Sequence, residues 1–145
     1  MTAAGTTMQD DAARDIDEGR THKQALVLRK DLNMRKGKMI AQASHASWGG
    51  PLSRATRVPG GWLIPDDADI GPWLDGKFAK IALSVDSEAE LVELHRKVAE
   101  SGLPCALIRD AGLTEFGGVP TLTALCIGPA EKSKIDVFTS ELKLL

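Results

Sequence analysis

Three polar side chains share one face of a predicted helix. The segment 35–48, RKGKMIAQASHASW, has a helical pattern and is followed by two glycines that would end the helix. Within it Lys38, Gln42 and His45 are spaced i, i+4 and i+7, which places them on one narrow stripe. Near the positive N-terminal end of a helix, these groups would favour an anionic ligand. A solvated polar face gives the same spacing, so the stripe alone assigns no function.

A carboxylate stands where a predicted strand ends. The apolar run 104–109 is followed by Asp110, Ala111 and Gly112, and ligands of open α/β sheets bind at the carboxyl ends of strands. Asp110 is therefore a candidate site residue. It could equally accept a hydrogen bond from the backbone of its own turn, which is the commoner role of an aspartate before small residues. The sequence leaves both roles open.

Other kinds of site are disfavoured. The three histidines, His22, His45 and His95, have no Cys, Asp or His partner at the spacing of zinc ligands. No glycine-rich nucleotide motif follows a predicted strand, and no nucleophile elbow surrounds a serine. Cys105 and Cys126 lie in apolar runs, which is typical of reduced core thiols. The sequence therefore predicts neither a structural metal nor a nucleotide site of these types.

The elements that must position these residues alternate in type. Strands are predicted at 24–29, 79–85, 104–109 and 121–127, and helices at 35–48, 87–101 and about 131–140. The helix at 87–101 joins two strands, which should be parallel because such a unit forms a right-handed crossover. The connection at 110–120 is short, rich in glycine and proline, and suits an antiparallel return. We therefore predict an α/β fold with a mixed four-stranded sheet.

Length and composition fit one folded unit. The chain has 145 residues, of which 43% are hydrophobic and 26% charged. Residues 1–22 contain five acidic residues and few large apolar ones, which predicts a disordered acidic tail before a folded domain at 23–145. The segment 49–77 has four prolines, six glycines and no clear periodicity, which predicts a long irregular loop. No apolar run approaches the roughly 18 residues of a membrane span, and the N-terminus lacks the pattern of a signal peptide, so we expect a cytoplasmic protein.

The charge is unevenly distributed. The formal net charge of -2 does not by itself indicate a nucleic-acid partner. The segment 23–38, however, carries six basic residues against one acidic residue and could attract phosphates. A solvated surface is the alternative for this segment. Three Trp, three Phe and no Tyr are too few for a sheet that stacks several bases.

Three segments together resemble the peptidyl-tRNA hydrolase 2 family. They are LVLRKDLNMRKGKMIAQASHAS, SGLPCALIRDAGLTEF and LTALCIGPAEKSKIDVFTSELKLL, and the similarity covers about residues 23–48 and 79–145. The resemblance implies hydrolysis of the ester that joins a peptide, or an N-blocked aminoacyl group, to tRNA, with release of free tRNA. It also implies a mixed four-stranded sheet flanked by helices on both faces and no metal or organic cofactor. The same resemblance suggests a homodimer.

The resemblance also assigns roles to single residues. It places the family's catalytic lysine on Lys38, its aspartate on Asp110 and its threonines on Thr114 and Thr123, with Thr121 as the alternative to Thr123. Asp110 would orient or deprotonate the attacking water, and Lys38 would stabilise the developing oxyanion or the leaving ribose oxygen. A threonine would hold the water or the carbonyl, and His45 could relay a proton. The substrate-binding residues implied are Gln42 and, for tRNA phosphates, Arg29, Lys30, Arg35 and Lys36.

Two departures from the family pattern lie beside the aspartate. Leu113 stands where a polar residue is typical, and Glu115 stands where glutamine is common and adds a negative charge near the expected tRNA. The segment 49–77 is also longer than expected and could be a lid, a dimer contact, a filter for a different acyl substrate or a packed insertion. Two other functions therefore stay open: a non-catalytic tRNA-binding or regulatory module, and a small-molecule acyl hydrolase with the long loop as a lid.

Overall fold

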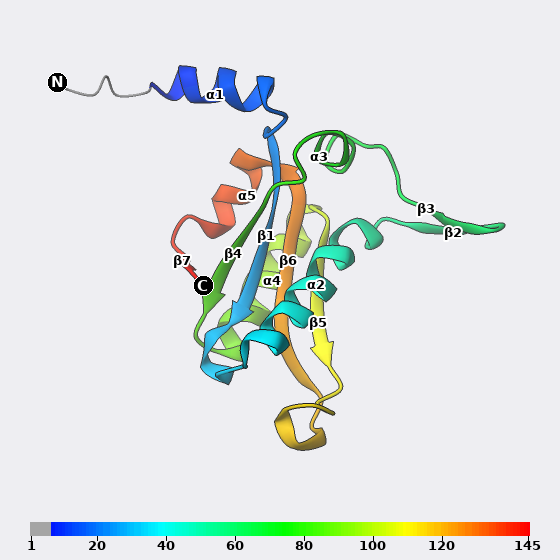
Figure 1. Cartoon of the computed structure of the whole chain (residues 1–145), viewed down its shortest axis with the longest axis vertical. Helices are drawn as coiled ribbons and strands as arrows, with labels where there is room; N and C mark the ends of the chain where they lie inside the picture. The colour runs from blue at the N-terminus through cyan, green and yellow to red at the C-terminus, as the bar shows by residue number, and fades with distance from the viewer. Residues whose placement is uncertain (1–6) are drawn as a thin grey trace.

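A mixed sheet of five strands forms the centre of the molecule (Figure 1). The computed structural model describes residues 7–145. The strands are β1 (His22–Arg29), β4 (Lys80–Val85), β5 (Cys105–Asp110), β6 (Thr121–Glu131) and β7 (Lys143–Leu144), in the order β5-β6-β1-β4-β7. β1 pairs in parallel with β4, whereas the other neighbours are antiparallel. The α/β class and the mixed sheet are confirmed, and the short β7 adds a fifth strand to the four predicted.

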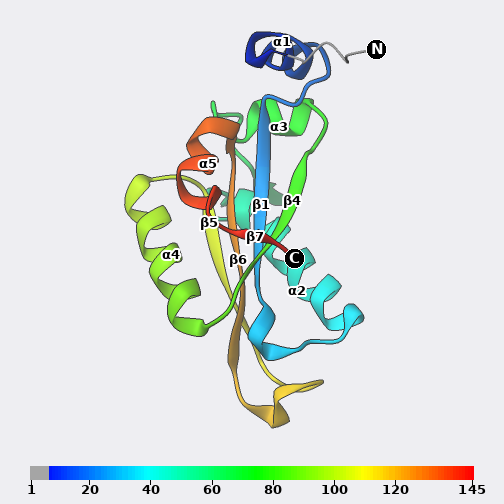
Figure 2. The same ribbon diagram turned by 90° about the vertical axis from the view of Figure 1, so that its left-hand side faces the viewer.

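Helices cover both faces of this sheet (Figure 2). α2 (Lys36–Leu52) packs on one face, and α4 (Glu88–Ser101) and α5 (Lys132–Thr139) pack on the other. The side chains of β1 alternate between the two cores: Ala25 and Val27 point to α4 and α5, while Leu26 and Leu28 point to α2. This strand is buried on both faces, which explains its nearly continuous apolar sequence.

The unit around α4 follows its local sequence signals. Ser87 Oγ accepts a hydrogen bond from the Glu90 N–H at 3.1 Å, and Gly102 ends the helix with a φ of 80°. β4 and β5, which flank α4, point the same way as predicted, although β1 and β6 lie between them. β5 and β6 are antiparallel, as the short connection predicts.

The segment 49–77 is more regular than the irregular loop predicted for it. α2 continues to Leu52, and the residues beyond form a hairpin of β2 (Thr56–Val58) and β3 (Gly61–Leu63) and a short helix α3 (Gly71–Asp75). The turn Pro59-Gly60 joins the two strands, with Gly60 at a φ of 82°. The hairpin projects from the body (Figure 1), whereas Trp73 of α3 is buried and stacks on Phe78 with ring centroids 4.0 Å apart. Elements this short lack the periodicity from which longer ones are predicted.

The acidic segment before β1 contains a helix. α1 (Met8–Asp17) lies within the range 1–22, where the composition predicts a disordered tail; residues 1–6 of that range lie outside the described residues. Thr7 caps this helix, since its Oγ1 accepts a hydrogen bond from the Asp10 N–H at 3.1 Å. α1 lies apart from the sheet in Figures 1 and 2. After α1 the chain contacts the rest of the domain at Gly19, whose carbonyl oxygen accepts a hydrogen bond from the Lys77 N–H at 2.8 Å. Among residues 7–145, no helix is both long and apolar enough to span a membrane.

Candidate active site

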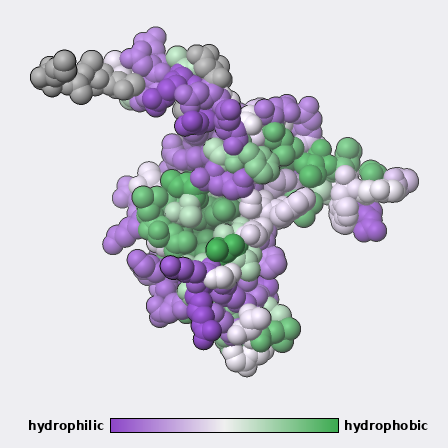
Figure 3. All heavy atoms as spheres, viewed as in Figure 1, coloured by the Kyte–Doolittle hydropathy of each residue, from purple (hydrophilic) through white to green (hydrophobic). Residues whose placement is uncertain are grey.

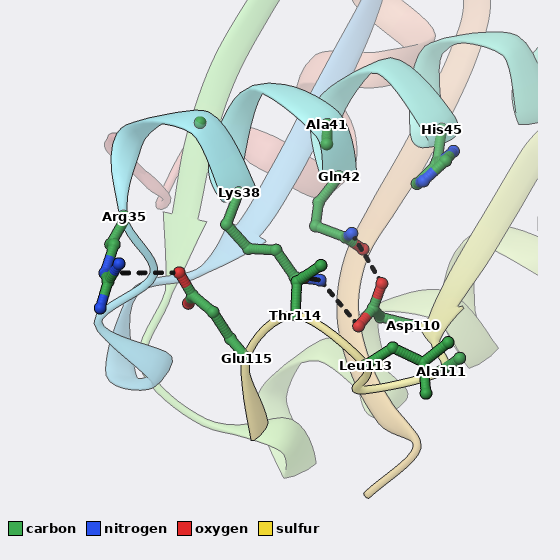
Figure 4. A pocket seen from close by; sticks show the side chains of 11 residues that line it. Arg35, Lys38, Ala41, Gln42, His45, Asp110, Ala111, Leu113, Thr114 and Glu115 are labelled. Carbon is green, nitrogen blue, oxygen red and sulfur yellow. Dashed lines mark hydrogen bonds and ion pairs between the residues drawn. The ribbon is translucent and has the colours of Figure 1, made fainter. Parts of the chain in front are cut away.

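A cavity of about 640 Å³ lies between the N-terminal half of α2 and the turn that follows β5 (Figure 4). One wall comes from α2 and the residue before it, because helical spacing places these side chains on one face. The other wall comes from the end of β5 and its turn. The lining residues are Arg35, Gly37, Lys38, Ala41, Gln42, His45, Asp110, Ala111, Leu113, Thr114 and Glu115, and none belongs to 49–77.

Asp110 connects the two walls of the cavity. Its Oδ2 accepts hydrogen bonds from Lys38 Nζ at 2.9 Å and from the Gly112 N–H at 2.8 Å, and its Oδ1 accepts one from Gln42 Nε2 at 3.1 Å. Gly112 has a φ of 80°, and a Cβ there would collide with the Val119 backbone. The two roles that the sequence left open thus coexist, since Asp110 caps its turn and also faces the cavity.

The surroundings of Asp110 favour its ionised form. The hydrogen bond from Lys38 lowers the pKa of Asp110 below its ordinary value; partial burial opposes this shift, and the Gly112 N–H, the charge of Lys38 and the Gln42 amide add to it. The side chains of Lys38 and Asp110 are only 10% and 15% exposed, so solvent screens their attraction weakly. A carboxylate has about four lone-pair positions. Three accept the hydrogen bonds just described, and the last, on Oδ1, can accept one from a water.

Lys38 Nζ contacts both the Asp110 carboxylate and the Thr114 hydroxyl. It donates to Thr114 Oγ1 at 2.7 Å as well as to Asp110, and it lies 5.4 Å from the centre of the Phe116 ring. An ammonium has three N–H donors, so one remains for an oxygen in the cavity. Because Thr114 accepts from Lys38, its own hydroxyl proton can be donated to a second oxygen. The arrangement can therefore stabilise negative charge that develops on an oxygen beside Lys38.

A bulge in β6 redirects Thr123. Ile108 pairs with Ala124 but Arg109 pairs with Leu122, so Thr123 is the extra residue in the register. Without the bulge, Thr123 and Ala124 would point to opposite faces of the sheet. Instead both side chains lie on the α2 side.

Thr123 consequently lies behind the cavity and not on its wall. It is fully buried, and its hydroxyl donates to Gln42 Oε1. That bond turns the amide NH₂ of Gln42 toward Asp110. The alternative residue, Thr121, donates to Val119 O at 2.8 Å. Neither threonine of β6 lines the cavity, which differs from the substrate contact predicted for one of them.

Two further lining residues and one residue beside Lys38 differ in how well the sequence predicts them. His45 lines it one turn beyond Gln42, as the stripe predicts. Leu113 is exposed at the cavity edge. Phe116 is missed by the sequence reasoning, because an aromatic residue in a turn has no local signal for a lysine partner. Among the side chains that the structure describes, the acidic, histidine and cysteine residues form no group of three that could hold a metal ion.

The four basic residues predicted to bind phosphates differ in exposure. Arg35 directly precedes α2, and its side chain is 92% exposed at the cavity edge. Lys30 and Lys36 are also exposed. Arg29 is mostly buried: its guanidinium pairs with Asp31 at 2.7 Å and donates to a carbonyl of β6 at 3.0 Å. Arg29 therefore makes its polar contacts within the protein, at the end of β1.

Comparison with known proteins identifies a family for the chain. The family model described as peptidyl-tRNA hydrolase PTH2 matches residues 22–145. Among curated proteins named peptidyl-tRNA hydrolase, that of Methanococcus vannielii is 44% identical over 124 residues, which are 86% of this chain and 99% of the relative. The Methanococcus maripaludis protein is 43% identical over 124 residues, with the same coverage of 86% and 99%. The Methanocaldococcus jannaschii protein is 41% identical over 123 residues, covering 85% of this chain and 99% of its own.

Proposed function

The chain belongs to the peptidyl-tRNA hydrolase PTH2 family, and we propose that Lys38, Asp110 and Thr114 form its catalytic centre. The reaction is hydrolysis of the ester that joins a peptide to tRNA, and its products are a free peptide and a free tRNA. One observation carries the assignment of the centre: a single ammonium, Lys38 Nζ, contacts both the carboxylate and the hydroxyl at the cavity.

Asp110 orients the attacking water. The remaining lone-pair position on its Oδ1 accepts a hydrogen bond from that water and directs it toward the ester carbonyl. Because its pKa is lowered, Asp110 is a weak base, so orientation contributes more than complete removal of a proton. Gln42 holds Oδ1 from the other side, and buried Thr123 holds Gln42. Thr123 is therefore a positioning residue in this mechanism.

Lys38 stabilises the charge that the attack produces. As the bond from water to the carbonyl carbon forms, the carbonyl oxygen becomes negative, and the third N–H of Lys38 is placed to donate to it. The Thr114 hydroxyl offers a second donor. When the intermediate collapses, the bond to the ribose oxygen breaks, and that oxygen takes up the proton that the attacking water loses. His45, on the same wall, can relay this proton.

Exposed basic residues around the cavity bind the tRNA. Arg35 and Lys36 lie at the start of α2, where the helix end adds positive potential, and Lys30 lies in the connection between β1 and α2. They contact phosphates and not bases, so affinity does not depend on tRNA sequence through these residues and weakens with salt. Arg29 is left out of this proposed set, because its side chain is only 11% exposed and pairs with Asp31.

The alternatives raised by the sequence gain no support. A lid formed by 49–77 would have to line the cavity, and none of the lining residues comes from that segment. The curated relatives carry the name of a hydrolase and not of a binding module. Peptidyl-tRNA is produced by ribosomes, which supports the cytoplasm as the place of action.

Release of peptide from N-acetyl-aminoacyl-tRNA by the purified chain tests the function. We expect turnover without added metal, and a KM that rises steeply with salt because phosphate contacts are screened. A well-folded chain that binds tRNA but releases no peptide would contradict the assignment of this cavity as a catalytic site.

We propose that two copies of the chain form a dimer through an apolar surface on the outer side of α2. We call it the α2–α3 surface; its exposed residues are Ile40, Trp48, Leu74 and Phe78. Two adjoining grooves, of about 210 and 400 Å³, share Trp48 and Phe78 in their walls. Hydrophobic side chains also gather over α3 and the base of the hairpin (Figure 3). Contiguous apolar surface of this kind marks an interface, and a two-fold dimer needs only one such self-complementary patch.

Trp48→Glu is expected to convert the dimer into a monomer, because it places a charge at the centre of the α2–α3 surface. Molar mass by light scattering after size exclusion measures this at micromolar concentration. Val137→Glu is the matched control, since Val137 is 75% exposed on α5, on the opposite face of the sheet. A monomeric wild type, or equal dissociation of both variants, would count against this surface.

A further inference from the structure

The charges on the cavity wall cancel. Two cationic side chains, Arg35 and Lys38, face two carboxylates, Asp110 and Glu115. Lys38 Nζ already forms an ion pair with Asp110 Oδ2 at 2.9 Å. Arg35 is thus the cation of this wall that is left for a phosphate, and the second carboxylate lies beside it. A site that must receive the end of a polyanion therefore offers no formal excess of positive charge.

Glu115 is partly buried, whereas Arg35 is exposed. Glu115 lies between Thr114 and Phe116, and both of these neighbours contact Lys38. Its side chain is 23% exposed, and its Oε1 lies 3.9 Å from Arg35 Nε. That distance is an ion pair without a hydrogen bond. Arg35, which is 92% exposed, can leave this pair at little cost, because ion pairs in contact with solvent contribute little to stability. Figure 4 shows the pair at the end of the cavity away from His45.

From this geometry we infer that Glu115 competes with tRNA phosphate for Arg35. The inference rests on the proposed function and adds a determinant of affinity to it. In the free protein the carboxylate holds Arg35; on binding, the guanidinium passes to a phosphate near the 3′ end of tRNA, and Glu115 is left facing that phosphate. Glu115 thereby weakens binding of peptidyl-tRNA and of the released tRNA alike. Because the carboxylate acts equally on the bound substrate and on the transition state, it raises KM and leaves the chemical step unchanged.

Glu115→Gln tests this competition with little change of shape. We expect the KM for N-acetyl-aminoacyl-tRNA and the Kd for deacylated tRNA both to fall about two- to fivefold, the range of an exposed charge pair. Glu88→Gln is the matched control, because it removes one negative charge from an exposed position of α4, on the far face of the sheet.

A second variant separates competition from simple repulsion. In an Arg35→Gln background, Glu115→Gln should lose most of its effect on Kd, since the group for which Glu115 competes is gone. An undiminished effect there, or equal effects of Glu115→Gln and Glu88→Gln in the wild-type background, would overturn the inference. Binding of deacylated tRNA needs no hydrolysis. A chain that released no peptide would therefore refute the proposed function, whereas an unchanged Kd would refute the competition.

Discussion

Lys38→Met is expected to lower kcat for peptidyl-tRNA hydrolysis by about a hundred- to a thousandfold, the cost of removing one oxyanion donor. Methionine keeps most of the length and removes the ammonium. That ammonium is the donor aimed at the developing charge, and it also fixes Asp110 and Thr114 at 2.9 and 2.7 Å. KM should change far less than kcat, because the lost contact forms mainly in the transition state. Single-turnover release of N-acetylated amino acid from tRNA measures the chemical step directly.

A control variant and a measurement of folding accompany this prediction. Lys97→Met removes an exposed lysine from α4, across the sheet from the cavity, and should leave kcat and KM unchanged. Thermal unfolding of Lys38→Met shows whether the variant is folded, since Asp110 loses its charged partner. A folded Lys38→Met protein that keeps more than about a tenth of wild-type kcat would show that the oxyanion is stabilised elsewhere, because an essential donor is worth more than tenfold.

The sequence predicts site residues best where the helical repeat alone determines which side chains lie on one face. Lys38, Gln42 and His45 fall on one wall because helical spacing alone places them there. Asp110 is predicted at a strand end, yet nothing local says that it meets Lys38, which is 72 residues away in the chain. Only the resemblance to a family pairs these two residues in advance. The structure adds the physical reason, because β5 ends beside the first turns of α2.

The roles of buried residues are predicted less well. Thr123 is expected in the cavity by motif, but the bulge in β6 turns it toward Gln42. A bulge depends on the register of two strands, and a single segment carries no signal for that register. Arg29 is similar: it belongs to a basic segment, yet the carbonyl and the carboxylate beside it take up its guanidinium. Charge counts along a chain cannot separate such a residue from one that faces solvent.

Asp110→Asn is expected to lower kcat by about a hundredfold or more, the range for a group that assists proton transfer or orients water. Asparagine has the same shape but offers one acceptor oxygen, whereas Asp110 accepts from Lys38, Gln42 and the Gly112 N–H. Lys38 would lose its counter-ion and its fixed position, and the water would lose its acceptor. Release of N-acetylated amino acid near pH 7 measures the loss. Activity equal to that of wild type would remove Asp110 from the mechanism.

The same substitution has a second consequence, which depends on pH. The pKa of Asp110 is lower in the folded protein than its ordinary value, chiefly because of the Lys38 hydrogen bond. The ionised carboxylate therefore stabilises the fold fully above the ordinary value of about 3.9. This contribution is lost as the pH falls through the lower folded-state pKa. Since asparagine does not titrate, the difference in free energy of unfolding between wild type and Asp110→Asn should be constant near neutrality and shrink in acid.

Urea unfolding of both proteins at neutral pH and below about pH 3.9 measures this difference. The wild type should be the more stable protein at neutral pH, and the two curves should approach each other in acid. Asp31→Asn is a useful comparison, because it removes another paired carboxylate, which contacts Arg29 outside the cavity. If the difference for Asp110→Asn instead grew as the pH fell, the folded-state pKa of Asp110 would be raised. The carboxylate would then suit a general base, and the role of Asp110 as an orienting group would be wrong.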